Sequence, residues 1–266
     1  MSKIRLDVAL FERGLCPSRE RARTTIMSGV VYVDGQKAEK PGTEIRETSE
    51  IEVRENPLAY VSRGGLKLEK ALDTFGIDVT GLHVIDAGAS TGGFTDCLLQ
   101  RGAAHVWAVD VGYGQLAWAI RNDPRVTCME RTNIRLMTPD MLGRAADMAV
   151  MDLSFISLSL VLPVIKSMTV PGGNVVCLVK PQFEAGREKV GKKGVIRDPE
   201  VHIEVLRRFC AQSGELDMPV KEITFSPIKG PTGNIEFLAH LVSAGAPGDV
   251  DIEKLVCEAH EELKAK

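Results

Sequence analysis

The sequence has few features that would tie it to a membrane, a metal ion or an oxidising compartment. Its N-terminus lacks the apolar stretch of a signal peptide, and no apolar run approaches the roughly 18 residues that span a bilayer. No two of its six cysteines form a Cys-x-x-Cys pair, which argues against a zinc site or a dithiol redox motif. We therefore expect a cytoplasmic protein with reduced thiols, no bound metal and no membrane partner.

A strong net charge is also missing, because 33 Lys and Arg residues stand against 36 Asp and Glu residues, for a net charge of -3. Overall electrostatics therefore do not predict a nucleic-acid-binding protein, and any such affinity must come from local basic patches. Hydrophobic residues make up 44% of the chain, enough for the core of a folded protein. The 266 residues suit one large domain, alone or with a small one beside it.

The first 57 residues carry a pattern of their own. Two helices are expected, one containing Leu6 and Leu10 and one over Arg19–Ser28, and Gly29 is placed to end the second. A strand over 30–33 and the Asp34-Gly35 turn signal predict a hairpin, with a last strand over 50–54. This predicts a small α+β domain over 1–57, a linker over 58–61 and a second domain over 62–266.

Basic residues gather in the two-helix part of this small domain. Residues 1–23 hold six bases against three acids, whereas residues 34–55 hold four bases against seven acids. A solvated helix surface is the ordinary explanation of such a run. Here Arg side chains crowd one short helix beside a turn, and the planar guanidinium fork suits phosphate, which favours nucleic-acid contact. The candidates are Arg5, Arg19, Arg21, Arg23 and, after the linker, Arg63.

The remaining residues alternate between strand and helix patterns, which predicts a mostly parallel, doubly wound α/β sheet covered on both faces. The clearest helix is expected over Glu200–Ser213, with Asp198 as N-cap and Gly214 after it. The last two strands follow each other without a helix, so one of them should be antiparallel. Strands are expected over 83–87, 105–110, 126–130, 148–152, 174–180, 221–226 and 235–242, and a terminal helix over 251–265.

The stretch Val84–Phe94 joins a hydrophobic strand to a glycine-rich loop and a helix. Its spacing is neither G-x-G-x-x-G nor that of a P-loop, and Asp86 at the strand end would repel phosphate. An acid there suits an amine or sulfonium ligand, such as S-adenosylmethionine, and Asp110 at the next strand end suits two ribose hydroxyls. A chance strand-helix turn is the alternative. The expected cofactor residues are Asp86, Gly88, Ser90, Gly92, Gly93, Phe94, Asp110 and Asn133, the last equally well an ordinary turn residue.

Several longer motifs add a family resemblance over nearly the whole chain. The sequences around Ser62–Leu68, Asp152–Phe155 and Val179–Glu184 resemble the TlyA-type ribosomal RNA methyltransferases, a family historically labelled hemolysins. Its catalytic domain is similar to FtsJ-like 2′-O-methyltransferases. The pattern around Arg5–Asp7, Pro17–Arg19 and Val33–Gly35 resembles the RNA-binding domain of ribosomal protein S-four.

The resemblance implies a Rossmann-like methyltransferase sheet with a small N-terminal RNA-binding domain. It also implies S-adenosylmethionine as cofactor, cytidine ribose in ribosomal RNA as target, and ribosomal subunits as partners. A catalytic Lys-Asp-Lys-Glu tetrad would be Lys67, Asp152, Lys180 and Glu236, and all four positions hold the expected residue.

These residue types fit the chemistry. A ribose hydroxyl must lose its proton as it attacks a methyl carbon, and a neutral lysine can accept that proton. Burial and a neighbouring cation both favour neutral lysine, so Lys67 would help Lys180 to act as the base, while Asp152 and Glu236 orient the pair. A structural ion-pair network is the alternative for any one of these residues.

The stretch Gly186–Arg197, directly after the Lys180 strand, is glycine-rich and basic. It could be a solvated loop, but its position favours phosphate contact. Two other kinds of protein stay open: a non-catalytic RNA-binding or ribosome-assembly protein, and a membrane-active hemolysin. The candidate RNA contacts in this loop are Arg187, Lys189, Lys192 and Lys193.

Overall fold

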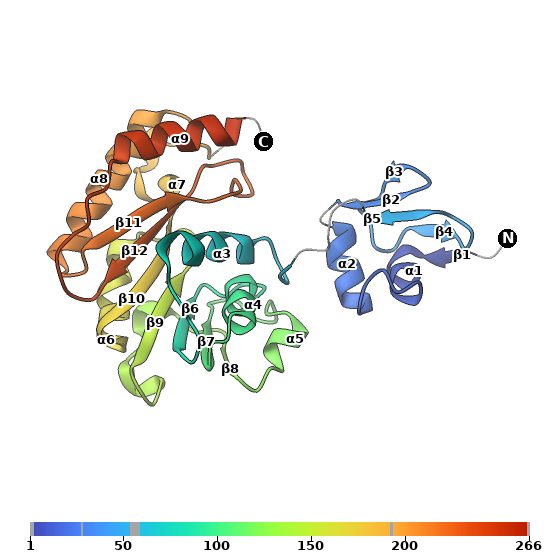
Figure 1. Cartoon of the computed structure of the whole chain (residues 1–266), viewed down its shortest axis with the longest axis horizontal. Helices are drawn as coiled ribbons and strands as arrows, with labels where there is room; N and C mark the ends of the chain where they lie inside the picture. Colours follow the sequence, from blue (N-terminus) through green and yellow to red (C-terminus); the bar gives the residue numbers. More distant parts are fainter. Residues whose placement is uncertain (1–2, 28, 54–58, 192–193, 265–266) are drawn as a thin grey trace. The chain divides into compact units, whose positions relative to one another are not determined.

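The computed structural model describes residues 3–27, 29–53, 59–191 and 194–264. The chain divides into two compact units, Met1–Arg63 and Gly64–Lys266, each of which has its own strands and helices (Figure 1). The expected domain limits, 1–57, 58–61 and 62–266, stay predictions.

Among the described residues of the N-terminal unit, two helices and five short strands pack around an apolar cluster that includes Leu6, Leu10 and Ile26. Asp34 (φ 50°) and Gly35 (φ 79°) form the tight turn of the hairpin, and both have the left-handed backbone that such a two-residue turn requires. Its elements are β1 (Lys3–Arg5), α1 (Leu6–Glu12), α2 (Arg19–Met27), β2 (Val31–Val33), β3 (Gln36–Lys37), β4 (Glu44–Arg46) and β5 (Ile51–Val53). The antiparallel pair β1–β4 was not expected, because strands of three residues leave little periodicity to read.

The second unit is built on one seven-stranded sheet with the order β11-β12-β10-β9-β6-β7-β8 (Figure 1). All neighbouring strands pair in parallel except β12, which is antiparallel to both β10 and β11. The strands are β6 (His83–Ala87), β7 (His105–Val109), β8 (Val126–Met129), β9 (Ala146–Met151), β10 (Thr169–Val179), β11 (Val220–Phe225) and β12 (Phe237–Val242). The predicted doubly wound α/β fold is thus confirmed.

Helices cover both faces of this sheet. On one face α6, α8 and α9 pack into a large apolar cluster with side chains such as Ile85 and Cys177. On the other face α3 packs against α4, β11 and β12. The helices are α3 (Gly64–Phe75), α4 (Gly93–Gln100), α5 (Trp118–Arg121), α6 (Leu162–Met168), α7 (Pro181–Glu184), α8 (Pro199–Glu215) and α9 (Ile252–Lys264), with short 3-10 turns at Ile134–Leu136, Pro139–Met141, Leu158–Leu160 and Arg187–Lys189.

The end of α8 differs from the prediction. Asp198 caps the helix by accepting a hydrogen bond from the Glu200 N–H (3.0 Å), as expected, but Gly214 lies inside the helix and does not end it. The left-handed residue that follows the helix is Asp217 (φ 54°), whose N–H donates to the Gly214 carbonyl. A short polar side chain tolerates this conformation well enough to replace glycine at a helix end.

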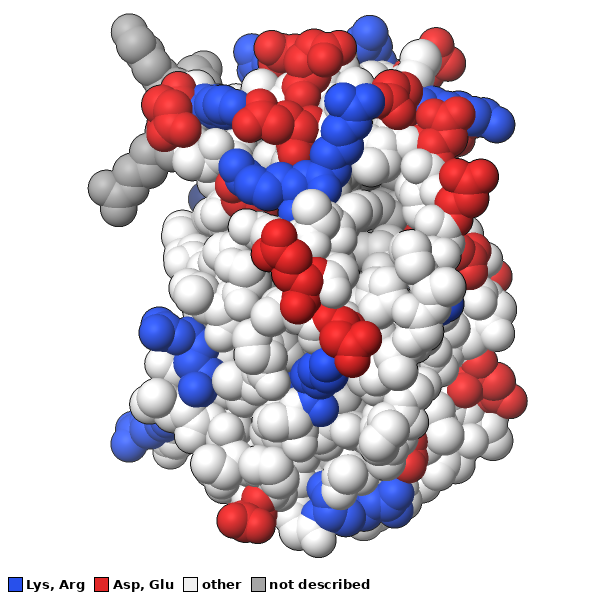
Figure 2. Space-filling view, turned by 90° about the vertical axis from the view of Figure 1, so that its left-hand side faces the viewer, with Lys and Arg blue, Asp and Glu red and all other residues white. Residues whose placement is uncertain are grey.

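Charges of both signs alternate on the face shown in Figure 2. Acidic and basic side chains crowd the upper part of this face, at the level of α8 and α9 in Figure 1. Much of the surface below them is uncharged. No field of a single sign therefore covers this face, in keeping with the small net charge. Among the described residues, no helix is both long and apolar enough to cross a bilayer.

Candidate active site

Four ionisable side chains from distant parts of the sequence meet at one edge of the large sheet. Lys67 lies on α3, Asp152 directly follows β9, and Lys180 directly follows β10. Glu236 directly precedes β12; it was expected inside that strand. Because β12 runs opposite to its neighbours, its first residues lie at the edge where the parallel strands end. The topology therefore brings together all four residues of the expected tetrad.

Lys67 and Glu236 form the most buried pair of this cluster. The Lys67 Nζ is 2.6 Å from Glu236 Oε2 and 3.8 Å from Asp152 Oδ2. A Cβ at Gly230 would lie 2.5 Å from Glu236 Oε1, so the loop backbone packs closely against this carboxylate. The Ser226 N–H donates to the Glu236 carbonyl (2.9 Å), which closes the loop between β11 and β12. The loop thus holds the carboxylate against the α3 lysine.

Lys180 forms the second pair. Its Nζ lies 2.6 Å from Asp152 Oδ1 and donates to the Ser154 hydroxyl at 3.0 Å. The Phe183 ring lies 5.9 Å from the same ammonium. Asp152 therefore bridges the two lysines, one on each carboxylate oxygen. Two cations and two anions balance in a largely buried place, where any one of them alone would be costly.

A pocket of about 440 Å³ adjoins the cluster and shares Asp152 and Ser154 with it. The loop after β6 forms part of its wall through Gly88 and Ser90. Gly88 has φ +87°, and a Cβ there would lie 2.6 Å from the Asp152 carbonyl oxygen, so only glycine lets the two chains approach this closely. Gly88 thus lets the loop after β6 pack directly against the backbone of Asp152, which belongs to the ionic cluster.

Asp110 is held in place on the pocket wall by backbone donors. Its Oδ2 accepts from the Ser90 N–H (2.8 Å) and its Oδ1 from the Gly112 N–H (2.7 Å). Each carboxylate oxygen keeps a further lone pair for a ligand hydroxyl. Asn133 also lines the pocket, and its Oδ1 caps the 3-10 turn at 134–136 by accepting from the Arg135 N–H (3.1 Å). Gly88, Ser90, Asp110 and Asn133 are therefore brought together as expected.

The other expected cofactor residues lie behind the pocket wall. Asp86 is fully buried; its Oδ2 accepts from the Thr95 hydroxyl at 2.6 Å, and its Oδ1 has no hydrogen-bond partner among the described residues. Burial, above all, raises the pKa of Asp86 to about 7. Gly92 (φ +94°) approaches Leu116, and Gly93 and Phe94 are buried at the start of α4. These residues support the loop instead of lining the pocket.

The prediction assigned no role to Phe155, which the structure places at the mouth of the pocket. Its side chain is 90% exposed, its backbone is left-handed (φ +62°), and its ring centroid lies 4.9 Å from that of Phe183. The motif Asp152–Phe155 was noticed, but exposure of its last residue depends on a backbone conformation that the sequence does not reveal. Gln115 and Arg135 also line the pocket and were missed.

Several of the arginines expected to bind RNA in the N-terminal unit are held by acceptor groups of the same unit. The Arg5 guanidinium donates to both oxygens of the buried Asp7 carboxylate (2.9 and 3.0 Å), and Arg19 lies 3.6 Å from it. The hydrogen bond from Arg5 lowers the pKa of Asp7. Arg21 donates to the Tyr60 carbonyl at 2.8 Å, whereas Arg23 is exposed. Asp7 thus offsets one of these charges and fixes two guanidinium groups at the surface.

Arg63, the last residue of the N-terminal unit, is exposed. In the second unit, Lys189 pairs with Glu204 of α8. That carboxylate reduces the charge that Lys189 offers a phosphate. The Arg187 side chain and residues Lys192 and Lys193 lie outside what the structure describes.

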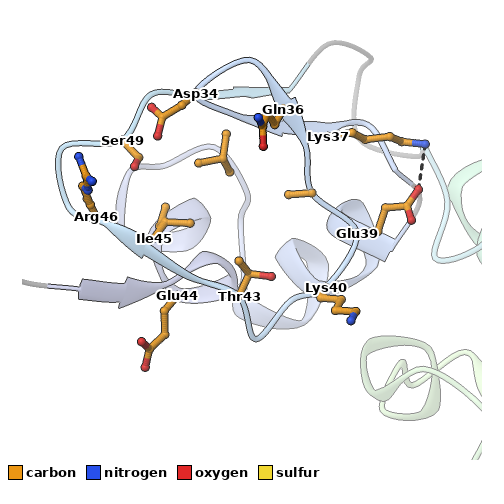
Figure 3. Close-up of a pocket in the computed structure, with 12 residues that line it drawn as sticks. Asp34, Gln36, Lys37, Glu39, Lys40, Thr43, Glu44, Ile45, Arg46 and Ser49 are labelled. Atoms are coloured by element: carbon orange, nitrogen blue, oxygen red, sulfur yellow. Dashed lines mark ion pairs between the residues drawn. The ribbon is translucent and has the colours of Figure 1, made fainter.

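A large pocket of about 720 Å³ lies in the N-terminal unit, between the β2–β3 hairpin and β4 (Figure 3). Its lysines and arginine are matched by acids, and Lys37 forms an ion pair with Glu39 (3.0 Å). This balance of charge makes it a poor site for a polyanion.

The doubly wound sheet carries a ligand pocket and a paired lysine-carboxylate cluster at its carboxyl edge. This combination defines an enzyme of the α/β class. Comparison with known families identifies the kind of enzyme. Residues 60–242 match the FtsJ-like methyltransferase family, and residues 4–51 match the S4 domain. The chain belongs to the FtsJ-like methyltransferase family, and it is an enzyme that takes a methyl group from a donor.

Individual relatives agree over almost the full length. A Bacillus subtilis protein provisionally named rRNA methyltransferase YqxC is 52% identical over 271 residues, which cover 99% of this chain and 96% of the relative. The 16S/23S rRNA (cytidine-2′-O)-methyltransferase TlyA of Mycobacterium tuberculosis is 47% identical over 240 residues, 90% of each chain. A solved Streptococcus thermophilus structure, provisionally named a hemolysin, has a TM-score of 0.79 and 46% identity and covers 100% of this chain and 98% of its own.

Proposed function

We propose that this chain transfers the methyl group of S-adenosylmethionine to the 2′-hydroxyl of a cytidine in ribosomal RNA. The observation that carries the proposal is the bridging of two buried lysines by Asp152 at the rim of the 440 Å³ pocket. The substrate is taken from the relative in Mycobacterium tuberculosis, whose name specifies cytidine 2′-O-methylation in 16S and 23S rRNA. Ribosomal subunits would then be its partners, and the cytoplasm its place of action.

The pocket fits the chemistry of S-adenosylmethionine. Asp110 offers two acceptors at fixed positions, which suits the two hydroxyls of a ribose. Gly88 and Ser90 leave room for a ligand against the backbone, and Asn133 is available to adenine. The carboxylates of Asp110 and Asp152 on the pocket wall favour a ligand with a positive charge. When bound, the cofactor supplies an electrophilic methyl carbon.

Lys180 would take the proton of the attacking hydroxyl. In its neutral form the amine accepts this proton, and the ammonium produced lies 2.6 Å from Asp152, which stabilises the new charge as it develops. Ser154, 3.0 Å from Nζ, directs the amine and keeps it from turning away.

Lys67 and Glu236 would position the reacting groups. Glu236 holds the Lys67 ammonium, and Lys67 in turn lies 3.8 Å from Asp152, so the orientation of that carboxylate depends on both. Much of the rate would come from this alignment of hydroxyl, base and methyl group. A purely structural ion-pair network would need the same contacts, but it would not need an adjoining pocket.

Two further features favour RNA as the substrate. The exposed Phe155 ring offers a face on which a nucleobase can stack beside the ionic cluster. The N-terminal unit, with its S4 domain, would bind RNA through Arg5, Arg19, Arg21 and Arg23. Arg63, Arg187, Lys189, Lys192 and Lys193 would add phosphate contacts.

The decisive experiment maps 2′-O-methyl groups in ribosomal RNA from a strain that lacks this gene and from the same strain with the gene restored. One or more cytidine methylations should disappear and return, and purified protein should add tritium from labelled S-adenosylmethionine to subunits from the deletion strain. Unchanged RNA together with no binding of S-adenosylmethionine would favour a non-catalytic ribosome-assembly role. A liposome-leakage assay tests the hemolysin alternative.

A further inference from the structure

A second cationic site lies outside the tetrad and the cofactor pocket. It is a pocket of about 380 Å³ between the segment 195–197, the β11–β12 loop and the end of α9. Three basic side chains line it: Arg197, Lys229 and Lys264. They come from three separate segments, so the fold brings them together and no local run of charge does.

These cations are not neutralised by neighbours within the part of the chain that the structure describes. No carboxylate lines the pocket, and none of the three side chains forms an ion pair with a described residue. Asp198, which follows Arg197 in the sequence, does not line the pocket; its carboxylate accepts the Glu200 N–H at the start of α8. The pocket in Figure 3 differs in this respect, because acids there offset the lysines and the arginine.

The wall of the pocket is fixed by a buried side chain. Asn234 is fully buried; its Oδ1 accepts from the Ile196 N–H (2.9 Å), and its Nδ2 donates to the Gly194 carbonyl (2.8 Å) and the Thr232 hydroxyl (3.0 Å). These three bonds tie the segment that carries Arg197 to the loop that carries Lys229. The arrangement is therefore a built feature, and its cations do not depend on a free surface loop for their positions.

The pocket lies at the same edge of the sheet as the catalytic cluster. Ile235 lines it, and the following residue is Glu236, whose carboxylate holds Lys67. The 226–236 loop and the segment after β10 both leave the sheet at the edge where Asp152 and Lys180 stand. An RNA strand whose ribose sits at Lys180 has neighbouring phosphates within reach of this edge, since successive phosphates follow the strand at short intervals.

We propose that Arg197, Lys229 and Lys264 form a site for one phosphate group, and that this phosphate belongs to the backbone of the bound RNA beside the methylated nucleotide. The assignment to RNA rests on the proposed function, whereas the phosphate chemistry does not. The site positions substrate and does not touch the reacting atoms.

The test compares two triple variants of the full-length protein with equal loss of charge. The first carries Arg197→Gln, Lys229→Gln and Lys264→Gln. The control carries Arg207→Gln, Lys221→Gln and Lys254→Gln, cations that lie outside the pocket. Binding of a labelled single-stranded RNA is measured at several salt concentrations, and methyl transfer to ribosomal subunits is measured beside it.

The pocket variant should bind the RNA several-fold more weakly, with a slope of log affinity against log salt smaller by about 1. Its KM for subunits should rise while kcat stays close to that of the wild type, because the lost contacts bind the substrate and the transition state equally. Equal effects of the two triple variants would overturn the proposal. Absence of methyl transfer by the wild type would overturn the proposed function and leave the phosphate site to be judged by binding alone.

Two further measurements distinguish the source of the phosphate, and the second of them needs no variant. Inorganic phosphate that raises the melting temperature of the wild type and the control, but not of the pocket variant, while RNA affinity is unchanged, would assign the site to a free phosphate and overturn the RNA assignment. In the wild type, bound RNA should protect Lys229 and Lys264 from acetylation by acetic anhydride and leave Lys254 reactive. Unprotected Lys229 and Lys264 would refute the proposal.

Discussion

The Lys67 ammonium and the Glu236 carboxylate lie 2.6 Å apart although 169 positions separate them in the sequence. Both side chains are almost fully buried, with 9% and 1% of their side-chain surface exposed. Removal of one partner therefore leaves a buried charge without full compensation, which is far more costly than removal of both. Single and double variants of the pair can therefore distinguish a structural role, which affects stability, from a catalytic role, which affects methyl transfer.

We expect Glu236→Ala to lower the free energy of unfolding by about 3–5 kcal/mol. The double variant Lys67→Met, Glu236→Leu should recover most of this loss, because apolar side chains of similar size fill the place of the ion pair. The double variant should nevertheless be inactive if the pair aligns the tetrad. Urea unfolding and tritium transfer measure the two quantities. A stable double variant with normal methyl transfer would show that the pair is structural only.

Lys180→Ala should lower kcat for methyl transfer by at least ~10²-fold, because the base that accepts the hydroxyl proton is lost. Binding of S-adenosylmethionine, measured by calorimetry, should stay near normal, since Lys180 does not line the cofactor pocket. Lys166→Ala is the matched control, as this lysine contacts Leu216 and Asp217 away from the site. Near-normal transfer by Lys180→Ala would refute its role as the base.

Much of the large domain could be predicted from its sequence, because long apolar strands separated by helices leave clear periodic patterns. The same rule predicted that Asp152 and Lys180 end neighbouring strands. Assignment of these two residues, and of Lys67 and Glu236, to a catalytic tetrad needed the family resemblance. Nothing local marks Lys67 or Glu236, and only the antiparallel direction of β12 brings Glu236 to the same edge.

Charge partners were the part that the sequence could not supply. Arg5 and Arg19 share Asp7, and Lys189 pairs with Glu204 on a helix 15 positions away. A count of basic residues along the chain treats each of them as free, whereas their local charge depends on tertiary neighbours. The phosphate pocket was missed for the converse reason, because its cations lie far apart in the sequence.

Gly88→Ala should disrupt the cofactor pocket. The added Cβ would meet the Asp152 carbonyl oxygen at 2.6 Å, in addition to the left-handed strain of about 1–2 kcal/mol that any such alanine incurs. Gly143→Ala is the matched control, with φ +75° and open space around its Cβ. Calorimetry should show a large loss of S-adenosylmethionine affinity for the first variant alone. Equal losses for both would point to strain and not to the close approach.

Phe155→Ala should leave stability unchanged within about 0.5 kcal/mol, because the side chain is 90% exposed. Loss of a stacking face should nevertheless weaken the productive binding of RNA by about 1–3 kcal/mol. Leu160→Ala, at another exposed apolar position, is the control. Steady-state methyl transfer to subunits measures the effect on kcat/KM, and equal activity of both variants would exclude stacking on this ring.

Asp86→Asn should change the way stability depends on pH. Burial raises the pKa of Asp86 to about 7 from an ordinary value of 3.8, so the folded protein favours the protonated carboxyl. The stability that this preference contributes is complete below pH 4 and is lost as the pH rises to 7, by an amount on the order of 4 kcal/mol. The amide does not titrate, so the variant should gain on the wild type over this range in urea unfolding.

Asp78→Asn supplies the opposite sign for comparison. Hydrogen bonds from Thr80 lower the pKa of Asp78, so its contribution is present at neutral pH and is lost on acidification. As the pH rises, Asp86→Asn should therefore gain stability relative to the wild type. Asp78→Asn should instead lose stability relative to the wild type as the pH rises through the range in which Asp78 titrates. A constant difference between pH 4 and 8 for Asp86→Asn would mean that its carboxyl ionises normally in the fold. Since a cation in the adjoining pocket favours the ionised carboxyl, affinity for S-adenosylmethionine should also rise with pH through about 7.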